Sequence, residues 1–403
     1  MTKLEELLKE YCPEGVEYKP LGEVCDYEQP IKYIVRSTDY KDEYDIPVLT
    51  AGQSFVLGYT NEHDNVYMAS KEQPVIIFDD FTTAMQWVDF NFKVKSSAMK
   101  MLKPKDEKIT LLRYLYFVMK SLRSDEQKDQ STHTRQWIGR FAKLQVPVPP
   151  LVVQREIVRI LDNFTLYLAE LTAELTARRK QYEFYRDSLL TFDKNVQQGG
   201  ANNSVQWKKL GEVAEIVRGA SPRPISSYIT DSQKGVNWIK IGDVPTDAKY
   251  VLSAKEKITQ EGANKSRFVH KGDFILSNSM SFGRPYILKI DGCIHDGWLS
   301  ISGFEDSIIS DFLYYILVSS EIQNIMRKKA SFGGAVQNLN ADIVRNLIIP
   351  IPPLAEQERI VAILDKFDAL CNDITAGLPA EIEMRKKQYE YYRDKLLTFK
   401  KRG

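Results

Sequence analysis

Apolar residues recur alternately four and three positions apart in two long stretches of the chain. In the first stretch, residues 151–194, this spacing continues over five heptads. A sustained seven-residue period predicts a helix that pairs with another helix in a left-handed coiled coil. Because proline lacks a backbone donor, Pro149 and Pro150 should end the preceding segment, and the helix should begin near Leu151. The predicted pairing positions are Ile157, Leu161, Phe164, Leu168, Tyr182, Tyr185 and Leu189.

The second stretch, residues 354–403, follows Pro352 and Pro353 and has the same spacing. It contains four extra residues, and such an insertion locally unwinds a coiled coil. Gly377 and Pro379 lie at the insertion, so the sequence predicts a kink or a short break in the helix there. The predicted pairing positions are Ile360, Leu364, Phe367, Tyr389, Tyr392 and Leu396.

The two stretches are repeats of each other. Residues 179–192 and 386–399 are identical at 11 of 14 positions, and residues 146–164 and 349–367 at 11 of 19. One apolar stripe alone is typical of a helix packed on its own domain, but two matched stripes make each helix the obvious partner of the other. Antiparallel pairing would place the intervening domains at opposite ends of the pair, and parallel pairing would place them at the same end.

Between the repeats, the two halves differ almost completely in sequence. Short alternating segments such as residues 75–78 and 274–276 predict strands, and helical patterns follow at residues 111–122 and 311–328. Strands followed by a late helix indicate an α+β domain with a curved or barrel-like sheet. The predicted order is a mixed domain, a helix, a linker, a second mixed domain and a second helix, at residues 1–150, 151–194, 195–204, 205–353 and 354–403.

The composition narrows the possible partners. The 403 residues carry a formal net charge of +1, so any nucleic-acid surface must be a local patch. Four cysteines without CxxC spacing indicate free thiols in a reducing cytosol rather than a zinc site. The charged N-terminal segment is unlike a signal peptide, and no apolar run reaches the length of a membrane span. We therefore expect a soluble, cytoplasmic protein without a membrane partner.

Motifs of catalysis are missing from the sequence. It contains no phosphate-binding loop, no HExxH zinc motif, no GxSxG elbow and no glycine-rich dinucleotide turn. Asp79 and Asp80 could be metal ligands, but a turn after a buried strand explains them better. His133 and His295 have no partner at a catalytic spacing. The sequence therefore favours binding over catalysis, with no catalytic or metal-ligating residue.

Polar and basic residues cluster with aromatic residues in both mixed domains. Arg, Lys, Asn, Gln and Ser are the residues that hold DNA phosphates and read base edges. Each cluster taken alone is also compatible with a solvated loop, but both domains carry such clusters although they share little else. The candidate DNA-binding residues are Lys32, Arg36, Gln53, Ser54, Thr83, Gln86, Trp87, Thr134, Arg135 and Gln136 in the first domain, and Arg218, Ser221, Arg223, Lys240, Lys265, Arg267, Asn278, Ser281, Arg284 and Gln337 in the second.

These features resemble the specificity subunit of type I restriction-modification systems. The resemblance covers nearly the whole chain and rests on PPLVVQREIVRILD and PPLAEQERIVAILD, on QYEFYRD and QYEYYRD, and on LGEV at both domain entries. It implies two mixed α/β target recognition domains, each followed by a long helix, the two helices pairing as an antiparallel coiled coil with pseudo-twofold symmetry. The insertion at Gly377 occurs in one copy only, which puts strict symmetry of the two docking faces in doubt.

The resemblance also implies a function and partners. Each recognition domain would read one half of an asymmetric, split site in double-stranded DNA, and the helices would set the gap. The helices would also dock methyltransferase subunits, two of them, and restriction and translocase subunits, again two, would join the complex. The chain itself would bind no cofactor, because S-adenosylmethionine, ATP and Mg would belong to the partner subunits.

Two other functions remain open from the residues alone. The chain could be a coiled-coil scaffold whose two domains bind proteins or glycans. It could also be a stand-alone nuclease or methyltransferase, which the missing motifs disfavour.

Overall fold

A computed structural model gives the structure of residues 2–50, 55–126, 140–192, 205–245, 248–278, 282–333, 336–373 and 375–403, without the side chains of residues 123–126, 331–333 and 336–338. The chain divides into two compact units, and the division cuts the first long helix after Glu170. The first unit contains residues 1–170 and 382–403, and the second contains residues 171–381. Each unit is described by itself.

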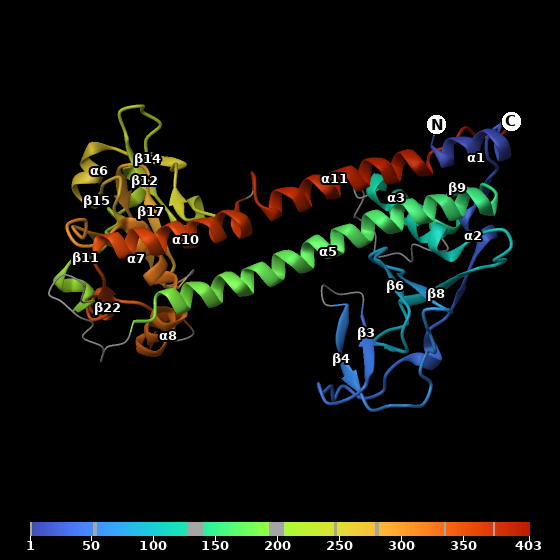
Figure 1. Cartoon of the computed structure of the whole chain (residues 1–403), viewed down its shortest axis with the longest axis horizontal. Coiled ribbons are helices and arrows are strands. Elements are labelled where there is room, and N and C mark those ends of the chain that lie inside the picture. The colour runs from blue at the N-terminus through green and yellow to red at the C-terminus, as the bar shows by residue number, and fades with distance from the viewer. Residues whose placement is uncertain are drawn as a thin grey trace. The chain divides into compact units, whose positions relative to one another are not determined.

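Two sheets form the domain of the first unit (Figure 1). The larger sheet has the order β2-β8-β5-β6, and all its neighbouring strands are antiparallel. The smaller sheet has the order β4-β3-β7. The strand bounds are β2 (Cys25–Glu28), β3 (Ile46–Leu49), β4 (Val56–Thr60), β5 (Val75–Asp79), β6 (Met85–Val88), β7 (Lys93–Val94) and β8 (Met99–Pro104).

The domain of the second unit repeats this topology. Its larger sheet has the order β11-β19-β16-β17-β13, and its smaller sheet has the order β14-β12-β18-β15. The first four strands of the larger sheet correspond to β2, β8, β5 and β6, and the first three of the smaller sheet to β4, β3 and β7. The bounds are β11 (Glu215–Arg218), β12 (Val236–Ile239), β13 (Tyr250–Val251), β14 (Glu256–Ile258), β15 (Arg267–Val269), β16 (Phe274–Ser277), β17 (Pro285–Leu288), β18 (Gly292–Ile294) and β19 (Trp298–Ser302).

Short elements close each domain. A two-stranded ladder joins the entry of each domain to the strand before its long helix: β1 pairs with β9 in the first unit and β10 with β22 in the second. The β strands involved, with the β20–β21 hairpin, are β1 (Tyr18–Pro20), β9 (Gln145–Pro147), β10 (Gln206–Lys209), β22 (Ile348–Ile351), β20 (Ser331–Gly333) and β21 (Val336–Asn338). The short α-helices are α1 (Lys3–Tyr11), α2 (Leu21–Val24), α6 (Gln260–Asn264) and α9 (Ala341–Arg345), and the short 3-10 helices are η1 (Ile31–Tyr33), η2 (Phe141–Lys143), η3 (Leu210–Glu212), η4 (Ile225–Ser227) and η5 (Ile241–Asp243).

The late helix of each domain lies close to the sequence prediction. In the first unit, α3 runs Leu112–Glu126. In the second, the helix predicted over 311–328 is two helices, α7 (Ser310–Val318) and α8 (Ser320–Lys329). The break occurs because the Ser319 backbone is extended and its hydroxyl accepts from the Ile322 N–H, which makes Ser319 the N-cap of α8.

The repeated stretches form long helices that begin after the proline pairs. The first helix, α5 (Leu151–Leu189), is continuous over 39 residues. The second is broken into α10 (Leu354–Asn372) and α11 (Leu378–Leu397), as the insertion predicted. A side chain at Gly377 would place its Cβ 2.5 Å from the Ala369 carbonyl oxygen, so only glycine allows the chain to pass this point without a shift.

The helices pair antiparallel within each unit. In the first unit, Phe164 of α5 stacks on Tyr392 of α11, with ring centroids 5.6 Å apart. Tyr167, further along α5, lies under Arg385, which comes earlier in α11, so the two helices run in opposite directions. In the second unit, Tyr185 stacks on Phe367 at 5.4 Å. The two stacks join equivalent positions of the repeat, since Phe164 matches Phe367 and Tyr185 matches Tyr392. The same contact therefore forms once in each unit.

The apolar stripes also pack on the domains. Ile157 and Leu161 are fully buried in one cluster with Tyr114 and Leu115 of α3 and with Leu397 of α11. In the second unit, Ile360 and Leu364 share a cluster with Leu313 of α7 and Tyr182 of α5. The beginning of each repeated helix thus contributes to a domain core and to helix pairing at once. None of the helices in the described part of the chain is long and apolar enough to cross a membrane.

A buried glutamine joins each helix start to its domain. The Gln154 amide donates to the carbonyls of Ile109 (2.8 Å) and Pro149 (2.7 Å), and its oxygen accepts from the Leu111 N–H (2.9 Å). Gln357, its match in the repeat, makes the same three bonds to Ser307, Pro352 and Ile309. Both side chains are fully buried. Three bonds from one side chain hold the loop before α3 or α7 against the first turn of the long helix.

Gln357→Met should therefore lower the free energy of unfolding by about 2–4 kcal/mol, because it leaves one N–H and two carbonyls buried without partners. Chemical denaturation of the purified chain measures this loss. Glu358→Ala, on the exposed face of the same helix, is the matched control and should leave stability unchanged. Equal stability of the two variants would contradict the role assigned to Gln357.

Candidate nucleic-acid interface

The antiparallel register brings three loops of the first domain to one edge of its larger sheet. Asp79, the last residue of β5, is paired with Met99, the first residue of β8. Glu28, the last residue of β2, is paired with Met101 of β8. The loop after β2, the β5–β6 hairpin turn and the β7–β8 loop consequently lie at the same edge. A hydrogen bond from Asp80 N–H to the Ala98 carbonyl (2.9 Å) joins two of these loops.

The second domain builds the same edge. Ser277 ends β16 opposite Trp298, and Arg218 ends β11 opposite Leu299. The Asn278 N–H bonds to the Gly297 carbonyl (3.1 Å), which matches the bond from Asp80 to Ala98. At Gly219 the loops touch so closely that a Cβ would lie 2.1 Å from the His295 carbonyl oxygen. The backbone of the loop after β11 is therefore fixed against the β18–β19 loop.

Asp296 is the centre of this edge in the second domain. Its carboxylate accepts from the Ser221 hydroxyl (2.7 Å), and its carbonyl accepts from Arg218 Nε (3.0 Å) and Asn278 Nδ2 (2.8 Å). The Ser221 hydrogen bond is the main cause that lowers the pKa of Asp296, so this carboxyl stays charged. Arg223 lies 4.0 Å from the carboxylate with its side chain 86% exposed. Four predicted DNA-binding residues thus meet around one acid.

Two further candidates border this cluster through the smaller sheet. Arg267 of β15 is paired with Ile294, the residue before His295, and its side chain is exposed. Lys240 directly follows Ile239, which is paired with the same Ile294, and forms an ion pair with Glu256. The edge therefore carries Arg218, Arg223, Arg267 and Lys240 close to the β18–β19 loop.

The remaining candidates of the second domain are more distant or internal. Lys265 donates to the Tyr228 hydroxyl (2.7 Å) and pairs with Glu261 (2.8 Å). Asn278 is 3% exposed, so its side chain supports the Asp296 loop and does not face solvent. Arg284 is half-buried at the base of the β16–β17 loop, where its carbonyl accepts from the Ser277 N–H.

In the first domain, the two predicted cations near this edge are held by carboxylates. Lys32 pairs with Glu28 (2.9 Å) and lies over the Tyr33 ring, and Arg36 pairs with Asp64 (2.8 Å) and Glu62. Both remain largely exposed, with side chains 60% and 72% accessible. Neither lies in a convergent cluster like that around Asp296.

The other described candidates of the first domain lie on the β5–β6 hairpin. Thr83 is in the turn with φ of 57°, and Gln86 is exposed on β6. Trp87 is half-buried and packs between Arg113 (4.6 Å from its ring centroid) and Tyr116 of α3. Gln53, Ser54, Thr134, Arg135, Gln136 and Ser281, and the side chain of Gln337, lie outside the described residues.

Asp79 and Asp80 form a turn, as the sequence favoured. Asp79 Oδ1 accepts from the backbone N–H groups of Phe81 and Thr82, and Asp80 pairs with Lys100 (3.2 Å) inside the domain. Among the described residues, no group of His, Cys, Asp or Glu has the arrangement of a metal site.

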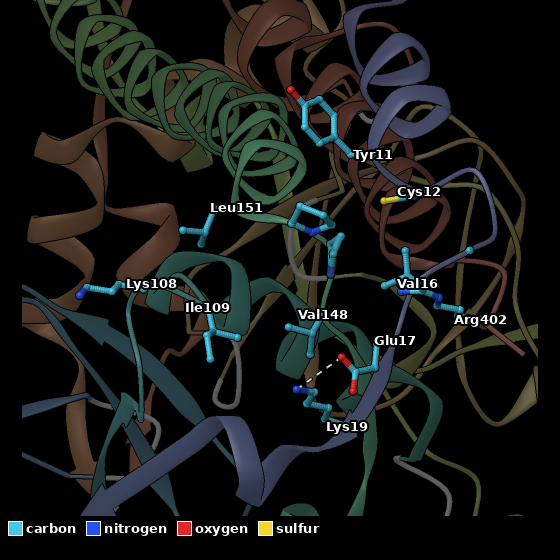
Figure 2. A pocket seen from close by; sticks show the side chains of 13 residues that line it. Tyr11, Cys12, Val16, Glu17, Lys19, Lys108, Ile109, Val148, Leu151 and Arg402 are labelled. Carbon is cyan, nitrogen blue, oxygen red and sulfur yellow. Dashed lines mark ion pairs between the residues drawn. The ribbon is translucent and has the colours of Figure 1, made fainter.

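A pocket of about 280 Å³ lies near the start of α5 in the first unit (Figure 2). Lys19, Lys108 and Arg402 contribute basic side chains to its wall, and Glu17 pairs with Lys19 at 3.4 Å. None of its lining residues is a candidate for DNA binding, so this pocket is separate from the candidate interface.

The sequence patterns did not reveal the residues that hold the loops at this edge. They also did not reveal the exposed aromatic residues on the hairpin and on the repeated helices. Asp296 and Phe81 have no motif around them, and their position became visible only through strand register. Phe184 and Tyr391 are 67% and 62% exposed on the repeated helices and occupy the same place in the repeat. That match was a usable signal, because an aromatic residue kept twice at an exposed position indicates a shared contact.

Comparison with known proteins adds a family to this geometry. A family model described as the type I restriction modification DNA specificity domain matches residues 13–178 and again residues 202–384. A type I restriction enzyme specificity subunit of Escherichia coli is 41% identical, with 100% of this chain and 98% of the relative covered. A putative type I restriction enzyme specificity subunit of Haemophilus influenzae is 32% identical, with 99% and 98% covered.

Solved structures share the fold. The S subunit of the type I restriction-modification system from M. genitalium superposes with a TM-score of 0.55 at 14% identity, covering 95% of this chain and 96% of that one. A chain from a structural study of complex assembly in the type I restriction-modification system superposes with a TM-score of 0.61 at 18% identity, covering 96% and 98%.

The backbone next to Asp296 is bonded to a histidine. The Gly297 N–H donates to His295 Nδ1 (2.8 Å), a bond that requires an unprotonated nitrogen. Burial lowers the pKa of His295; Asp296 and Asp243 oppose this shift, and Lys240 adds to it. The folded pKa therefore lies below the unfolded value of about 6.5. As the pH falls, the unfolded chain binds this proton first, so the stability contributed above about pH 6.5 is lost below it.

We expect His295→Gln to flatten the decrease in stability of the chain between about pH 7 and pH 5. Glutamine keeps an acceptor for the Gly297 N–H but does not titrate. Denaturant unfolding at a series of pH values measures the slope. An unchanged slope in His295→Gln would contradict the assignment.

Proposed function

Because the chain belongs to the family of type I restriction modification DNA specificity subunits, the non-catalytic DNA-recognition subunits of these systems, we propose that it reads a split site in double-stranded DNA. Each domain reads one half-site, and the antiparallel helix pairing sets the number of unread base pairs between them. The target is asymmetric because the two domains present unlike side chains.

The observation that carries this proposal is the shared edge of the two domains. Their larger sheets have the same strand order and place equivalent loops at the same edge. The residues on those loops differ: the loop after β11 carries Arg218, Ser221 and Arg223, whereas the equivalent loop after β2 carries Pro30 and Lys32. One backbone arrangement with two sets of loop residues is what two readers of different half-sites require.

The chemistry of the second edge suits a duplex. Exposed arginine contacts phosphates or forms two hydrogen bonds to guanine in the major groove. The Arg223 and Arg267 side chains are exposed. The hydrogen bonds of Asp296 fix the backbone of the loops beside them. A fixed backbone that carries exposed guanidinium groups reduces the ordering cost of binding.

We further propose that the repeated helices dock methyltransferase subunits, one at each unit. Phe184 packs edge-on against Tyr185, and Tyr391 against Tyr392, with centroids 5.6 and 5.3 Å apart. Exposed aromatic residues are enriched at the centre of protein interfaces. S-adenosylmethionine belongs to the methyltransferase subunits. ATP and Mg belong to the restriction and translocase subunits that join the complex.

Methylome sequencing of cells that express the chain with its methyltransferase subunit tests the DNA proposal. It should report two short motifs separated by unspecified bases. In binding assays, the affinity of the complex should fall steeply between about 50 and 200 mM salt, because phosphate contacts release counterions. A contiguous motif would contradict a split site, and binding that does not depend on salt would favour a protein- or glycan-binding scaffold instead.

Arg218→Ala combined with Arg223→Ala should weaken DNA binding about tenfold or more and lower the salt dependence by about two ions, if both contact phosphates. The matched control is Arg327→Ala with Lys328→Ala, which removes the same charge from the exposed face of α8. Equal loss in both variants would show a general charge effect and would argue against this edge as the interface.

Phe184→Ala and Tyr391→Ala should each remove one methyltransferase subunit from the complex, and the double variant should remove both. The mass of the purified complex in solution measures this directly. Met384→Ala is the control, because Met384 is 60% exposed on α11 but its match in the first copy is Ala177. A double variant that assembles like the wild type would exclude these aromatic residues from docking.

A further inference from the structure

We propose that the β5–β6 hairpin of the first domain enters the major groove and that Phe81 at its tip packs on a thymine methyl group of the first half-site. This inference rests on the proposed function and names the contact by which the first domain recognises one base.

The β5–β6 hairpin is equivalent to the loop of the second domain that lies beside the Asp296 cluster. β5 and β6 correspond to β16 and β17, and the Asp80 N–H makes the same loop contact as the Asn278 N–H. In the second domain this edge gathers arginines, whereas in the first Lys32 and Arg36 pair with carboxylates and Lys95 of the β7–β8 loop donates to the Tyr40 hydroxyl (3.2 Å). The first domain therefore presents a different kind of contact at the equivalent edge.

Two buried acids fix the hairpin. Asp79 and Asp80 are 4% and 2% exposed. Asp79 Oδ1 accepts from Phe81 N–H (3.0 Å), Thr82 N–H (2.6 Å) and the Thr82 hydroxyl (2.8 Å). Asp80 pairs with fully buried Lys100, whose ammonium lies 4.4 Å from the Tyr27 ring centroid. A turn held this firmly loses little conformational freedom when it binds.

The tip that this arrangement presents is apolar. Phe81 is 51% exposed and is the residue that directly follows the two buried acids. The Thr82 hydroxyl is occupied by Asp79, and Thr83 adopts the left-handed conformation, which is costly for a β-branched residue. The turn thus maintains a strained backbone that keeps an aromatic ring in solvent.

A thymine methyl group is the feature of the major groove that matches this tip. The groove admits a two-stranded β-ribbon, and the methyl group of thymine is its apolar marker, contacted by Phe and Thr side chains. The Phe81 ring would bury this methyl group, and the Thr82 hydroxyl beside it is already bound to Asp79. Cytosine lacks the methyl group and would be disfavoured.

The test uses the assembled complex with its methyltransferase subunit and a duplex that carries both half-sites. Each thymine of the first half-site is replaced in turn by deoxyuridine, which removes only the methyl group. One replacement should weaken wild-type binding about fivefold or more. Phe81→Ala should weaken binding to the normal duplex by a similar factor and should no longer respond to that replacement. Phe90→Ala, at another exposed phenylalanine of the same domain, should retain the wild-type response.

A second pair of variants tests the acid that positions the tip. Asp79→Ala removes the acceptor for the turn and should abolish the response to deoxyuridine, whereas Asp79→Asn keeps an acceptor oxygen and should restore it. If Asp79 acted only on stability, its variants would change the unfolding midpoint, but the same deoxyuridine replacement would still weaken binding.

Three outcomes would overturn the inference: Phe81→Ala binding the normal duplex within about twofold of wild type, a full deoxyuridine response in Phe81→Ala, or failure of Phe81→Ala to assemble with the methyltransferase without DNA. The last would make the tip a protein contact. Each leaves the split-site proposal intact, provided that the wild-type complex still protects two separated half-sites; loss of that protection would instead refute the proposed function.

Discussion

The structure depends on the contact between the start of one repeated helix and the end of the other. In the first unit, Leu161 near the start of α5 and Leu397 at the end of α11 lie in the same core. In the second, Leu364 near the start of α10 and Tyr182 near the end of α5 do the same. Each core is thus completed by a segment distant in sequence, and the aromatic stacks on Phe164 and Phe367 have nearly the same spacing. The repeats stay alike because both must satisfy this one geometry.

The domains attach to these constant helices through different chemistry at the same helix position. Asp162 Oδ1 of α5 accepts from Nε (2.8 Å) and Nη2 (2.7 Å) of Arg113 from α3. Its match in the repeat, Asp365, accepts from the Tyr315 hydroxyl and pairs with Lys249 at 3.3 Å. Both cations lie on aromatic rings of their own domain. A fixed carboxylate on the helix therefore accepts whichever donor a diverged domain supplies, which allows the domain sequence to vary while its attachment persists.

The part of the fold that repeats along the chain could be predicted, and the part that depends on distant contacts could not. A seven-residue period over five heptads predicted α5, and the four-residue insertion predicted the break before α11. The pattern could not reveal that Ile157 would serve a domain core as well as the helix pair, because both environments select the same apolar residue. The helical period did not predict the break at Ser319. A serine hydroxyl caps a new helix only where the backbone around it is extended, and the sequence pattern does not show that conformation.

The candidate interface shows the same limit. Lys32 and Arg36 were selected for their charge, yet Glu28, Glu62 and Asp64 already bind them. Arg218 and Ser221 were selected on equal grounds, and they meet Asp296 only because antiparallel register joins strands about 80 residues apart. Composition can identify residues able to contact DNA, but only strand register decides which of them share an edge.

Acidic residues at these edges hold the loops, and in the proposed function they leave contact with DNA to other side chains. A carboxylate facing a phosphate backbone would repel it, but Asp79 and Asp80 are buried and Asp296 is engaged by Ser221. Each acid orders the backbone that carries the exposed residues: Phe81 in one domain and Arg223 in the other. Because the acids bind mainly backbone groups and neighbouring anchors, the exposed residues can change without loss of the loop. If this edge reads DNA as proposed, a fold with such acidic anchors can acquire a new DNA specificity by changing only the side chains that these anchors present.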